Sequence, residues 1–458
     1  MSHHWFVACP LGLESILEQE LRDLGATEIE SRRGGARFQG DRSLGERCCL
    51  WLRTAIRVQL ELAVGEVQDE DDIYDLIRGI EWERFLSVDG TLAVSAAVRD
   101  SFLTHSHFTA LLSKDAVVDR FRDREGDRPG VDTDDPDLPL RVLLRENTLR
   151  VYVDLAGQSL HKRGYREIQV RSPLNEALAC GLVMLTEWDR KTPFVDPMCG
   201  SGTLPIEAAR LAADIAPGLQ RTFACERWED AVKVRWRRLR DEAEHRAEVG
   251  LARSDFPEIL ASDRHPGALE LAREGAQRGR VGGKIRFAKC DVGSAPAPSR
   301  SCLIVTNPPY GERIGTDPED LENSWRGLGE FLRACPKDSM AFVLSGDPKP
   351  TQWLRLKASA RIPVMNGGID CRLLRYPVGG QAEAVARRLE KRALPSMDDP
   401  LERLPEPEPQ PQFRPEVSGP VGIEPEVPEL SPDPEHGKER DDREPDGQTP
   451  PTTGDAES

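Results

Sequence analysis

The stretch Phe194-Val195-Asp196-Pro197-Met198-Cys199-Gly200-Ser201-Gly202-Thr203 decides the fold that we expect. It predicts a buried strand, a tight turn with two glycines, and a helix whose apolar residues recur at helical spacing from Leu204 onward. Gly200 and Gly202 let the backbone turn sharply and approach a ligand closely, and the first turn of the helix offers free N–H groups. The stretch therefore predicts a site for a nucleotide-like cofactor.

The same turn argues against two common cofactors. It lacks the third glycine of the dinucleotide fingerprint, and no Gly-Lys-Ser/Thr follows it as in a phosphate-binding loop. These features disfavour NAD and ATP. Two glycines alone would leave an ordinary strand-to-helix turn without a ligand as an equal alternative.

Two carboxylates follow the next two apolar stretches of the chain. Asp263 ends the stretch 258–263, and Asp291 ends the stretch 286–291. In an open parallel sheet, side chains at the carboxyl ends of the strands line the ligand crevice. We therefore expect Asp263 to accept from a pair of ribose hydroxyls and Asp291 to accept from an adenine amino group. Each Asp alone would more often be a helix cap or a loop residue.

A fourth apolar stretch delivers Asn307, Pro308, Pro309 and Tyr310. The exocyclic amino group of a base is a poor nucleophile, because its lone pair is delocalised into the ring. If the Asn307 side-chain oxygen and the Pro308 carbonyl accept its two hydrogens, the lone pair can point at an electrophilic methyl group. Tyr310 can stack on a base extruded from its helix. We therefore predict Asn307, Pro308 and Tyr310 as catalytic residues of an N-methylation.

Together these motifs resemble class I S-adenosylmethionine-dependent methyltransferases that modify exocyclic amino groups. The resemblance extends over most of the chain and is carried by five stretches, FVACPLGLE (6–14), KRGYR (162–166), PLNE (173–176), NPPYGERIG (307–315) and NGGIDCRLLRY (366–376). These stretches resemble the THUMP-domain RNA guanine-N2 methyltransferases, specifically the branch that acts on large-subunit ribosomal RNA. The resemblance implies S-adenosyl-L-methionine as the cofactor and RNA as the partner.

The resemblance also implies roles for individual residues. The methionine part of the cofactor would be held by residues of the glycine turn and its strand, Asp196, Cys199, Gly200 and Gly202. Asn175 and Glu176 would close nearby, and these two roles rest on the resemblance alone. Asn307, Pro308 and Tyr310 would hold the guanine.

We expect an α/β chain with a Rossmann-like class I methyltransferase domain, in which a parallel sheet ends in a C-terminal antiparallel hairpin, preceded by ferredoxin-like and THUMP α+β domains. The expected segments are a ferredoxin-like domain at 1–65, a THUMP RNA-binding domain at 66–165, the methyltransferase domain at 166–380 and an acidic tail at 396–458. Ser172 and Pro173 predict the N-cap and first turn of a helix.

The acidic charge of the chain lies mostly in the tail. The formal net charge is −17, of which residues 396–458 carry −13, so that residues 1–395 carry only −4. The tail also holds 14 of the 36 prolines. We expect it to be disordered, with a partner that the sequence does not identify. The acidity therefore does not argue against a nucleic-acid substrate.

Membrane and metal sites are not predicted. No run of 18 apolar residues occurs, and residues 1–10 lack the basic region of a signal peptide, so we expect a cytoplasmic protein with no membrane partner. The ten cysteines are scattered without a Cys-x-x-Cys pair, which predicts reduced thiols and no metal centre.

Lys162, Arg163 and Arg166 are the candidates for phosphate contacts with RNA. The basic residues of 233–240 are flanked by acids, which favours a solvated, salt-bridged helix. The competing functions are a tRNA guanine-N2 methyltransferase, an adenine-N6 DNA methyltransferase that shares the Asn-Pro-Pro-Tyr loop, and a non-catalytic RNA-binding assembly factor. A nicotinamide oxidoreductase lacks its fingerprint.

Overall fold

A computed structural model describes residues 2–166, 174–296, 298–310 and 317–378. The chain divides into a unit at Met1–Leu401 and a unit at Glu402–Ser458. The expected tail at 396–458, the helix start expected at Ser172 and Pro173, and the end of the NPPYGERIG stretch lie outside the described residues.

An eight-stranded sheet, in the order β2-β3-β1-β4-β8-β7-β5-β6, is built from the first part of the chain. Its strands are β1 (His3–Ala8), β2 (Thr27–Arg32), β3 (Gly35–Gly40), β4 (Arg57–Glu66), β5 (Thr91–Arg99), β6 (Gly130–Val131), β7 (Leu138–Arg145) and β8 (Thr148–Asp154). β4 pairs antiparallel with β1 on one side and with β8 on the other. The two domains expected at 1–65 and 66–165 therefore share one sheet.

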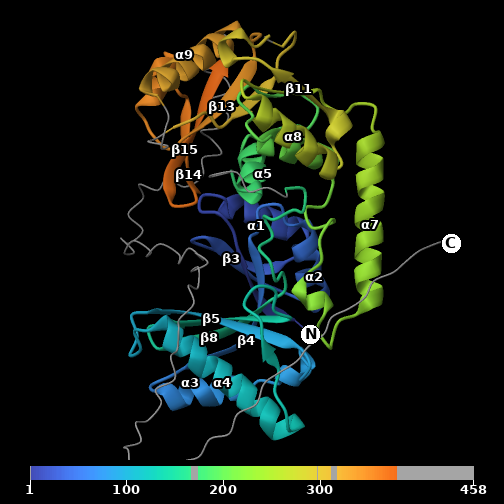
Figure 1. The fold of residues 1–458 in the computed structure, drawn as a ribbon, viewed down its shortest axis with the longest axis vertical. Helices are drawn as coiled ribbons and strands as arrows, with labels where there is room; N and C mark the ends of the chain where they lie inside the picture. Colours follow the sequence, from blue (N-terminus) through green and yellow to red (C-terminus); the bar gives the residue numbers. More distant parts are fainter. Residues whose placement is uncertain (1, 167–173, 297, 311–316, 379–458) are drawn as a thin grey trace, which may run out of the picture. The chain divides into compact units, whose positions relative to one another are not determined.

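The helices of this part follow the apolar spacing of the sequence. They are α1 (Glu14–Asp23), α2 (Arg42–Trp51), α3 (Glu70–Arg78), the short 3-10 helix η1 (Trp82–Arg84) and α4 (Ser106–Glu125). Leu17 and Leu21 of α1 are fully buried, as their spacing predicts. α2 begins after Asp41, whose carboxylate accepts from the Leu44 amide at 2.8 Å. α3 and α4 pack together, and α4 lies along β5 (Figure 1).

The second sheet has seven strands in the order β11-β10-β9-β12-β13-β15-β14. They are β9 (Phe194–Asp196), β10 (Ile259–Asp263), β11 (Ile285–Lys289), β12 (Leu303–Thr306), β13 (Ser339–Ser345), β14 (Ala360–Asn366) and β15 (Ile369–Val378). The first five strands in the order are parallel, and β15 and β14 form an antiparallel hairpin at the edge. The expected parallel sheet with a C-terminal antiparallel hairpin is confirmed.

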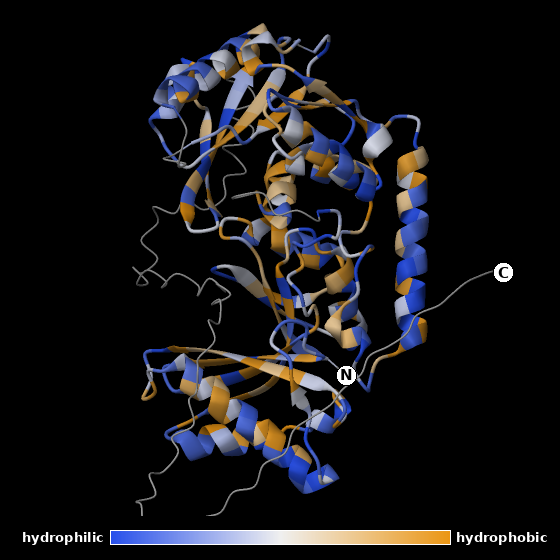
Figure 2. Ribbon diagram, viewed as in Figure 1, coloured by the Kyte–Doolittle hydropathy of each residue, from blue (hydrophilic) through white to orange (hydrophobic). Residues whose placement is uncertain are grey.

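The helical elements of this part connect those strands. They are α5 (Glu176–Leu185), α6 (Thr203–Ala212), η2 (Ala224–Glu226), α7 (Lys233–Ala252), α8 (Pro266–Arg278), η3 (Gly282–Lys284), η4 (Val292–Ser294), α9 (Pro318–Ala334) and η5 (Pro350–Leu354). In Figure 2 apolar segments concentrate in the strands, whereas much of the helix surface is hydrophilic. The buried apolar residues of both sheets belong to one continuous core.

The order of the second sheet reverses between β9 and β12. From β9 the chain proceeds outward through β10 and β11, and it then returns to place β12 on the other side of β9. Ligands of open α/β sheets bind at the carboxyl ends of the strands beside such a reversal. The glycine turn follows β9 and the Asn307 loop follows β12, so both predicted motifs lie at this point.

Charged side chains of α7 form ion pairs with other parts of the chain. Arg235 bonds with both oxygens of Glu46, a fully buried residue of α2. Arg240 of α7 lies 2.6 Å from Glu226, and Arg246 lies 2.8 Å from Asp214. The expected salt-bridged helix is therefore present, and its ion pairs reach other elements.

Candidate functional site

A pocket of about 280 Å³ lies at the carboxyl ends of β9, β10 and β12 and beyond β11. Gly200, Asp263, Asp291 and Asn307 all line it. These residues come from four separate stretches of the sequence, and each was predicted as part of one site. The fold brings them together.

The glycine turn is built from two left-handed residues. Gly200 has φ +54° and Gly202 has φ +80°. A Cβ placed on Gly200 would meet no atom within 4 Å, so the backbone is open there. A Cβ on Gly202 would lie 2.8 Å from the Cβ of Ala272, so glycine is needed for α6 and α8 to approach. Cys199, directly before Gly200 in the turn, is buried, and burial raises the pKa of its thiol well above the usual value.

Asp263 supports the glycine turn and faces the pocket. Its Oδ2 accepts from the Gly200 amide at 2.8 Å, and its Oδ1 accepts from the His265 amide at 2.9 Å. A carboxylate oxygen accepts more than one hydrogen bond, so each oxygen keeps capacity for a ligand hydroxyl. Asp291 is exposed and accepts from the Gly293 amide at 3.1 Å.

Asp196 is buried at the end of β9. Its Oδ1 accepts from Thr306 Oγ1 at 2.8 Å and from the Met198 amide at 3.2 Å. Burial raises the pKa of Asp196 to about 7, although the Thr306 hydrogen bond opposes this shift. Thr306 was not among the predicted site residues; its place directly before Asn307 was the available signal.

Asn307 has the most informative environment in the pocket. Its side-chain oxygen is buried and has no hydrogen-bond partner among the described residues. Such an acceptor costs about 1–3 kcal/mol, so it marks a place where an N–H donor of a ligand would be stabilising. Fully buried Trp325 of α9 donates from Nε1 to the Pro309 carbonyl at 2.7 Å and holds the loop in place. Sequence reasoning missed Trp325, because no local pattern in the sequence joins α9 to this loop.

Tyr310 does not line the pocket that contains Asn307. Its side chain is 3% exposed, and its hydroxyl accepts from Asn366 Nδ2 at 2.9 Å. A Cβ on Gly346 would lie 2.7 Å from its ring, so β13 and the β14–β15 hairpin enclose the ring tightly. The expected open stacking face of Tyr310 is therefore not presented in this conformation. Pro308 is buried as well and does not line the pocket.

Asn175 and Glu176 stand at the start of α5. The Asn175 side chain accepts from the amides of Ala177 and Leu178, so Asn175 is the N-cap. α5 begins at Glu176, and the helix start expected at Ser172 and Pro173 falls on residues outside the described part of the chain.

The buried Glu176 carboxylate lies 3.1 Å from Arg166 Nη1, and Arg166 Nη2 donates to Thr203 Oγ1. Thr203 is the first residue of α6, directly after Gly202. Arg166 therefore connects the start of α5 with the glycine turn, and its phosphate-contact role stays a prediction.

The other two predicted phosphate contacts have opposite environments. Lys162 is exposed. Arg163 is 1% exposed, donates to the Leu160 carbonyl at 2.8 Å and to the Arg53 carbonyl, and lies 4.0 Å from Glu207. A guanidinium committed to buried carbonyls cannot reach a phosphate from this position, so the expectation for Arg163 is corrected: it joins structural elements.

Within the described ranges, no helix is long and apolar enough to cross a membrane. No group of three or more metal-ligating side chains occurs in that same part of the chain. All ten cysteines are described and free, and nine of them are buried.

Three families match successive segments of the chain. Residues 4–59 match the RlmL ferredoxin-like domain, residues 67–154 match the THUMP domain, and residues 163–375 match the RMKL-like methyltransferase domain. The segments agree in order and kind with the expected domains, whose exact boundaries stay predictions.

Two relatives illustrate the similarity. The ribosomal RNA large subunit methyltransferase K/L of Syntrophotalea carbinolica is 39% identical over 386 residues, which are 82% of this chain and 54% of that protein. The protein slr0064 of Synechocystis sp., provisionally named an RNA methyltransferase, is 36% identical over 81% of this chain and 96% of its own length. The chain spans about half the length of the K/L relatives it matches.

Solved structures share the fold. The crystal structure of SMU.472 in complex with SAH, a protein provisionally assigned as a methyltransferase, has a TM-score of 0.74 and 26% identity, and covers 83% of this chain and 99% of its own. A Listeria monocytogenes protein described as a predicted N6-adenine-specific DNA methylase has a TM-score of 0.74 and 29% identity. The match covers 82% of this chain and 97% of that protein's chain.

Proposed function

We propose a function from one premise: this chain belongs to the family of RMKL-like methyltransferases that carry an RlmL-type ferredoxin-like domain and a THUMP domain. The proposed activity is transfer of a methyl group from S-adenosyl-L-methionine to the exocyclic N2 amino group of a guanine in RNA. Large-subunit ribosomal RNA is the first candidate substrate, because the K/L relatives are named for it. A tRNA substrate is the alternative.

The pocket fits an adenosine-bearing cofactor, which supplies an electrophilic methyl group when bound. Gly200 leaves backbone open to the pocket, and Asp263 offers carboxylate oxygens of the kind that accept from ribose hydroxyls. Asp291 offers an acceptor for an adenine amino group. Asp196 lies behind the turn, where its ionised form would favour a cation.

The unpartnered Asn307 side-chain oxygen carries the proposal. It lines the same pocket as Asp263 and Asp291, and it lacks a hydrogen-bond donor among the described residues. An amino group that donates to this oxygen would turn its lone pair away from the ring. No strong base is required, because the amine becomes acidic once methylated and its proton can pass to Asn307 or to water. Catalysis in this proposal consists of positioning and desolvation.

The direct test is incubation of the protein with labelled S-adenosylmethionine and unmodified RNA, followed by mass spectrometry of the nucleosides. Separate reactions contain ribosomal RNA, tRNA and duplex DNA. We expect N2-methylguanosine in ribosomal RNA. N2-methylguanosine in tRNA alone would select the alternative substrate, and N6-methyladenine in DNA would overturn the guanine assignment. RNA binding without any transfer would indicate a non-catalytic assembly factor.

A further inference from the structure

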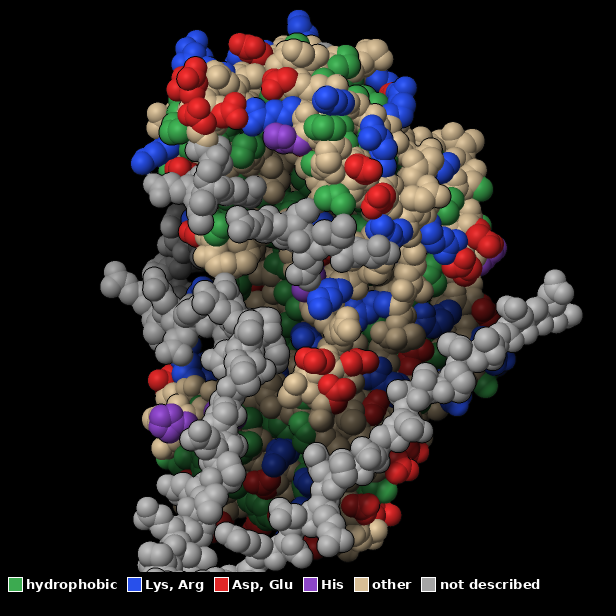
Figure 3. Space-filling view, viewed as in Figure 1, with side chains coloured by type: hydrophobic (Ala, Val, Ile, Leu, Met, Phe, Trp, Pro, Cys, Tyr) green, Lys and Arg blue, Asp and Glu red, His purple; other side chains and the backbone are tan. Residues whose placement is uncertain are grey.

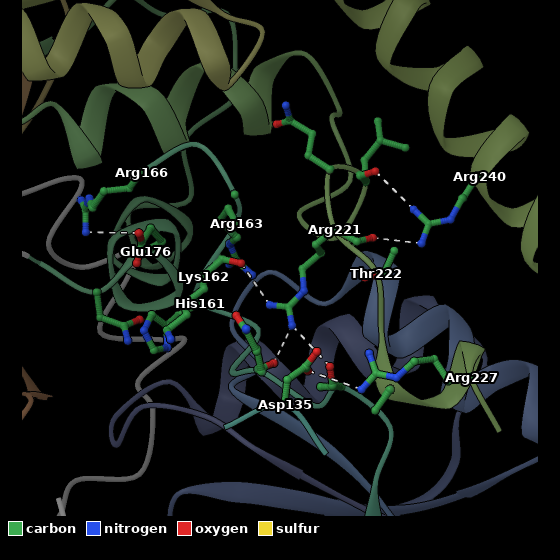
Figure 4. Close-up of a pocket in the computed structure, with 17 residues that line it drawn as sticks. Asp135, His161, Lys162, Arg163, Arg166, Glu176, Arg221, Thr222, Arg227 and Arg240 are labelled. Atoms are coloured by element: carbon green, nitrogen blue, oxygen red, sulfur yellow. Dashed lines mark hydrogen bonds and ion pairs between the residues drawn. The ribbon is translucent and has the colours of Figure 1, made fainter. Parts of the chain in front are cut away.

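A second and larger pocket, of about 870 Å³, is lined by residues from several parts of the chain. They come from Asp135, from the connecting segment 156–166, from the start of α5, from the loop 219–227 and from Arg240 of α7 (Figure 4). On the face drawn in Figure 3, Lys and Arg side chains gather near the middle of the molecule. Asn175 and Glu176, which the resemblance places near the cofactor, also line this pocket, whereas Gly200, Asp263, Asp291 and Asn307 do not.

Arg221 organises the pocket from within. Its guanidinium donates to the backbone carbonyls of Ser159 at 2.6 Å, Lys162 at 3.0 Å and Gln158 at 2.5 Å. Figure 4 shows it pointing at the backbone that carries His161 and Lys162. These carbonyl oxygens accept from the two terminal nitrogens and do not neutralise the charge, and the buried Nε has no hydrogen-bond partner among the described residues. Arg221 therefore shapes the connecting segment and leaves a positive charge beside it.

The remaining arginines of the pocket are already paired with carboxylates. The pairs are Arg227 with Asp135 and Asp137, Arg240 with Glu226, Arg166 with Glu176, and Arg163 with Glu207 at 4.0 Å. In the described part of the chain, neither Lys162 nor Arg221 forms an ion pair. Lys162 is exposed, so its ammonium group can meet a ligand at the rim. The uncompensated positive charge of the pocket is thus concentrated at Lys162 and Arg221.

His161 responds to this charge. Its Nδ1 lies 2.7 Å from Ser159 Oγ, and no hydrogen bond of its Nε2 occurs among the described residues. Burial, followed by the charges of four nearby cations beginning with Arg163 and Lys162, lowers the pKa of His161 to about 4. The four cations place His161 in a positive potential, which an anion would relieve.

We propose that the pocket binds a backbone phosphate of the RNA strand, with Lys162 and His161 contacting the phosphate and Arg221 supplying charge from behind. This inference rests on the proposed RNA substrate. The pocket is larger than one phosphate group needs, which favours a strand over a free anion. The segment that carries His161 and Lys162 ends at Arg166, which donates to Thr203 at the start of α6, directly after the glycine turn. The segment that would hold the strand therefore also contacts the glycine turn.

The test measures RNA binding without turnover. A fluorescent oligouridylate of about ten nucleotides is titrated at several salt concentrations against wild type, Lys162→Gln and the control Lys337→Gln, which removes an exposed charge outside the pocket. Loss of one phosphate contact on a single strand lowers the salt slope by about 0.7, or about 5-fold in affinity at 0.1 M salt. We expect this loss for Lys162→Gln and not for the control. Equal slopes in the two variants would overturn the proposal.

Two further measurements distinguish a lost phosphate contact from a damaged protein, and an RNA strand from a small anion. S-adenosylmethionine affinity and melting temperature should be unchanged in Lys162→Gln. The RNA-binding result does not depend on turnover, so it tests the phosphate site even if the methyl-transfer proposal fails. NMR titration of His161 should show its pKa rise when the oligonucleotide binds. If inorganic phosphate gives the same rise at the same concentration, the site belongs to a small anion and the strand assignment is wrong. Should Lys162→Gln misfold, His161→Gln takes its place, and an affinity equal to that of wild type would overturn the proposal.

Discussion

The Gly200 amide donates to the Asp263 carboxylate with an N···Oδ2 distance of 2.8 Å, which joins the turn after β9 to the end of β10. The other carboxylate oxygen accepts from the His265 amide. A residue expected only to meet a ligand thus also fixes the backbone that forms the pocket. Its substitution should affect ligand binding through both roles.

Asp263→Ala is expected to weaken S-adenosylmethionine binding by about 1–3 kcal/mol, because a charged hydrogen-bond acceptor is lost. S-adenosylhomocysteine has the same ribose hydroxyls and should lose as much. Calorimetry of both ligands measures the effect. Asp263→Asn keeps an oxygen for the Gly200 amide and should lose less than Ala. Unchanged affinity for both ligands in Asp263→Ala would remove this residue from the site.

Asn307→Ala is expected to lower turnover by at least about 10²-fold, comparable to the loss of one oriented polar group in other active sites. Cofactor affinity should change little. Because the side-chain oxygen has no partner among the described residues, the free energy of unfolding should stay level or rise. Single-turnover assays with saturating RNA, together with denaturant unfolding, measure both effects.

Asn307→Asp is the companion variant. It keeps an acceptor and adds a charge near the proposed cofactor, so its residual turnover should exceed that of Asn307→Ala. Wild-type turnover in the Ala variant would show that the loop is structural only.

Ionisation of the buried Asp196 carboxyl should lower the stability of the fold as the pH rises. Its folded pKa of about 7 exceeds the usual carboxyl value, so between about pH 4 and 7 the folded state binds more protons than the unfolded state. The free energy of unfolding therefore falls by roughly 1.4 kcal/mol per pH unit across that window because of this group. Asp196→Asn should be more stable than wild type at pH 8, with the difference shrinking toward pH 4.

Asp189 provides a control of opposite sign for the same pH series. Partial burial acts to raise its pKa, but hydrogen bonds from Thr192 and Lys191 lower it overall. Asp189→Asn should therefore be less stable than wild type at pH 7, and this deficit should shrink as the pH falls below the usual carboxyl pKa. Melting temperatures of wild type and both variants across the pH range test the two signs.

Gly250→Ala should destabilise the fold by about 1–3 kcal/mol or more, because its new Cβ would lie 1.9 Å from the Ala213 carbonyl oxygen. Gly267→Ala in α8 is the matched control, since its Cβ would meet nothing within 4 Å. The control should gain about 0.5–1 kcal/mol from the lower entropy of the unfolded chain. Chemical unfolding of both variants compares the two, and equal stability would show that α7 moves aside easily.

Several features followed from the sequence because they depend on residues close together in the chain. The glycine turn at 200–202 needs only a strand, two left-handed residues and a helix start, all encoded within ten residues. Asp263 and Asn307 were predictable for a related reason. Each directly ends or follows an apolar strand, and parallel strands present these ends at one edge.

The remaining features depended on contacts between distant segments. Tyr310 is enclosed by Gly346 and Asn366, Arg163 is held by the Arg53 carbonyl, and Trp325 supports the Pro309 carbonyl.

Local spacing determined which elements form and where polar side chains leave the strands. Only tertiary packing decided which of those side chains stay accessible, because burial and hydrogen-bond partners come from residues that the sequence order does not place together.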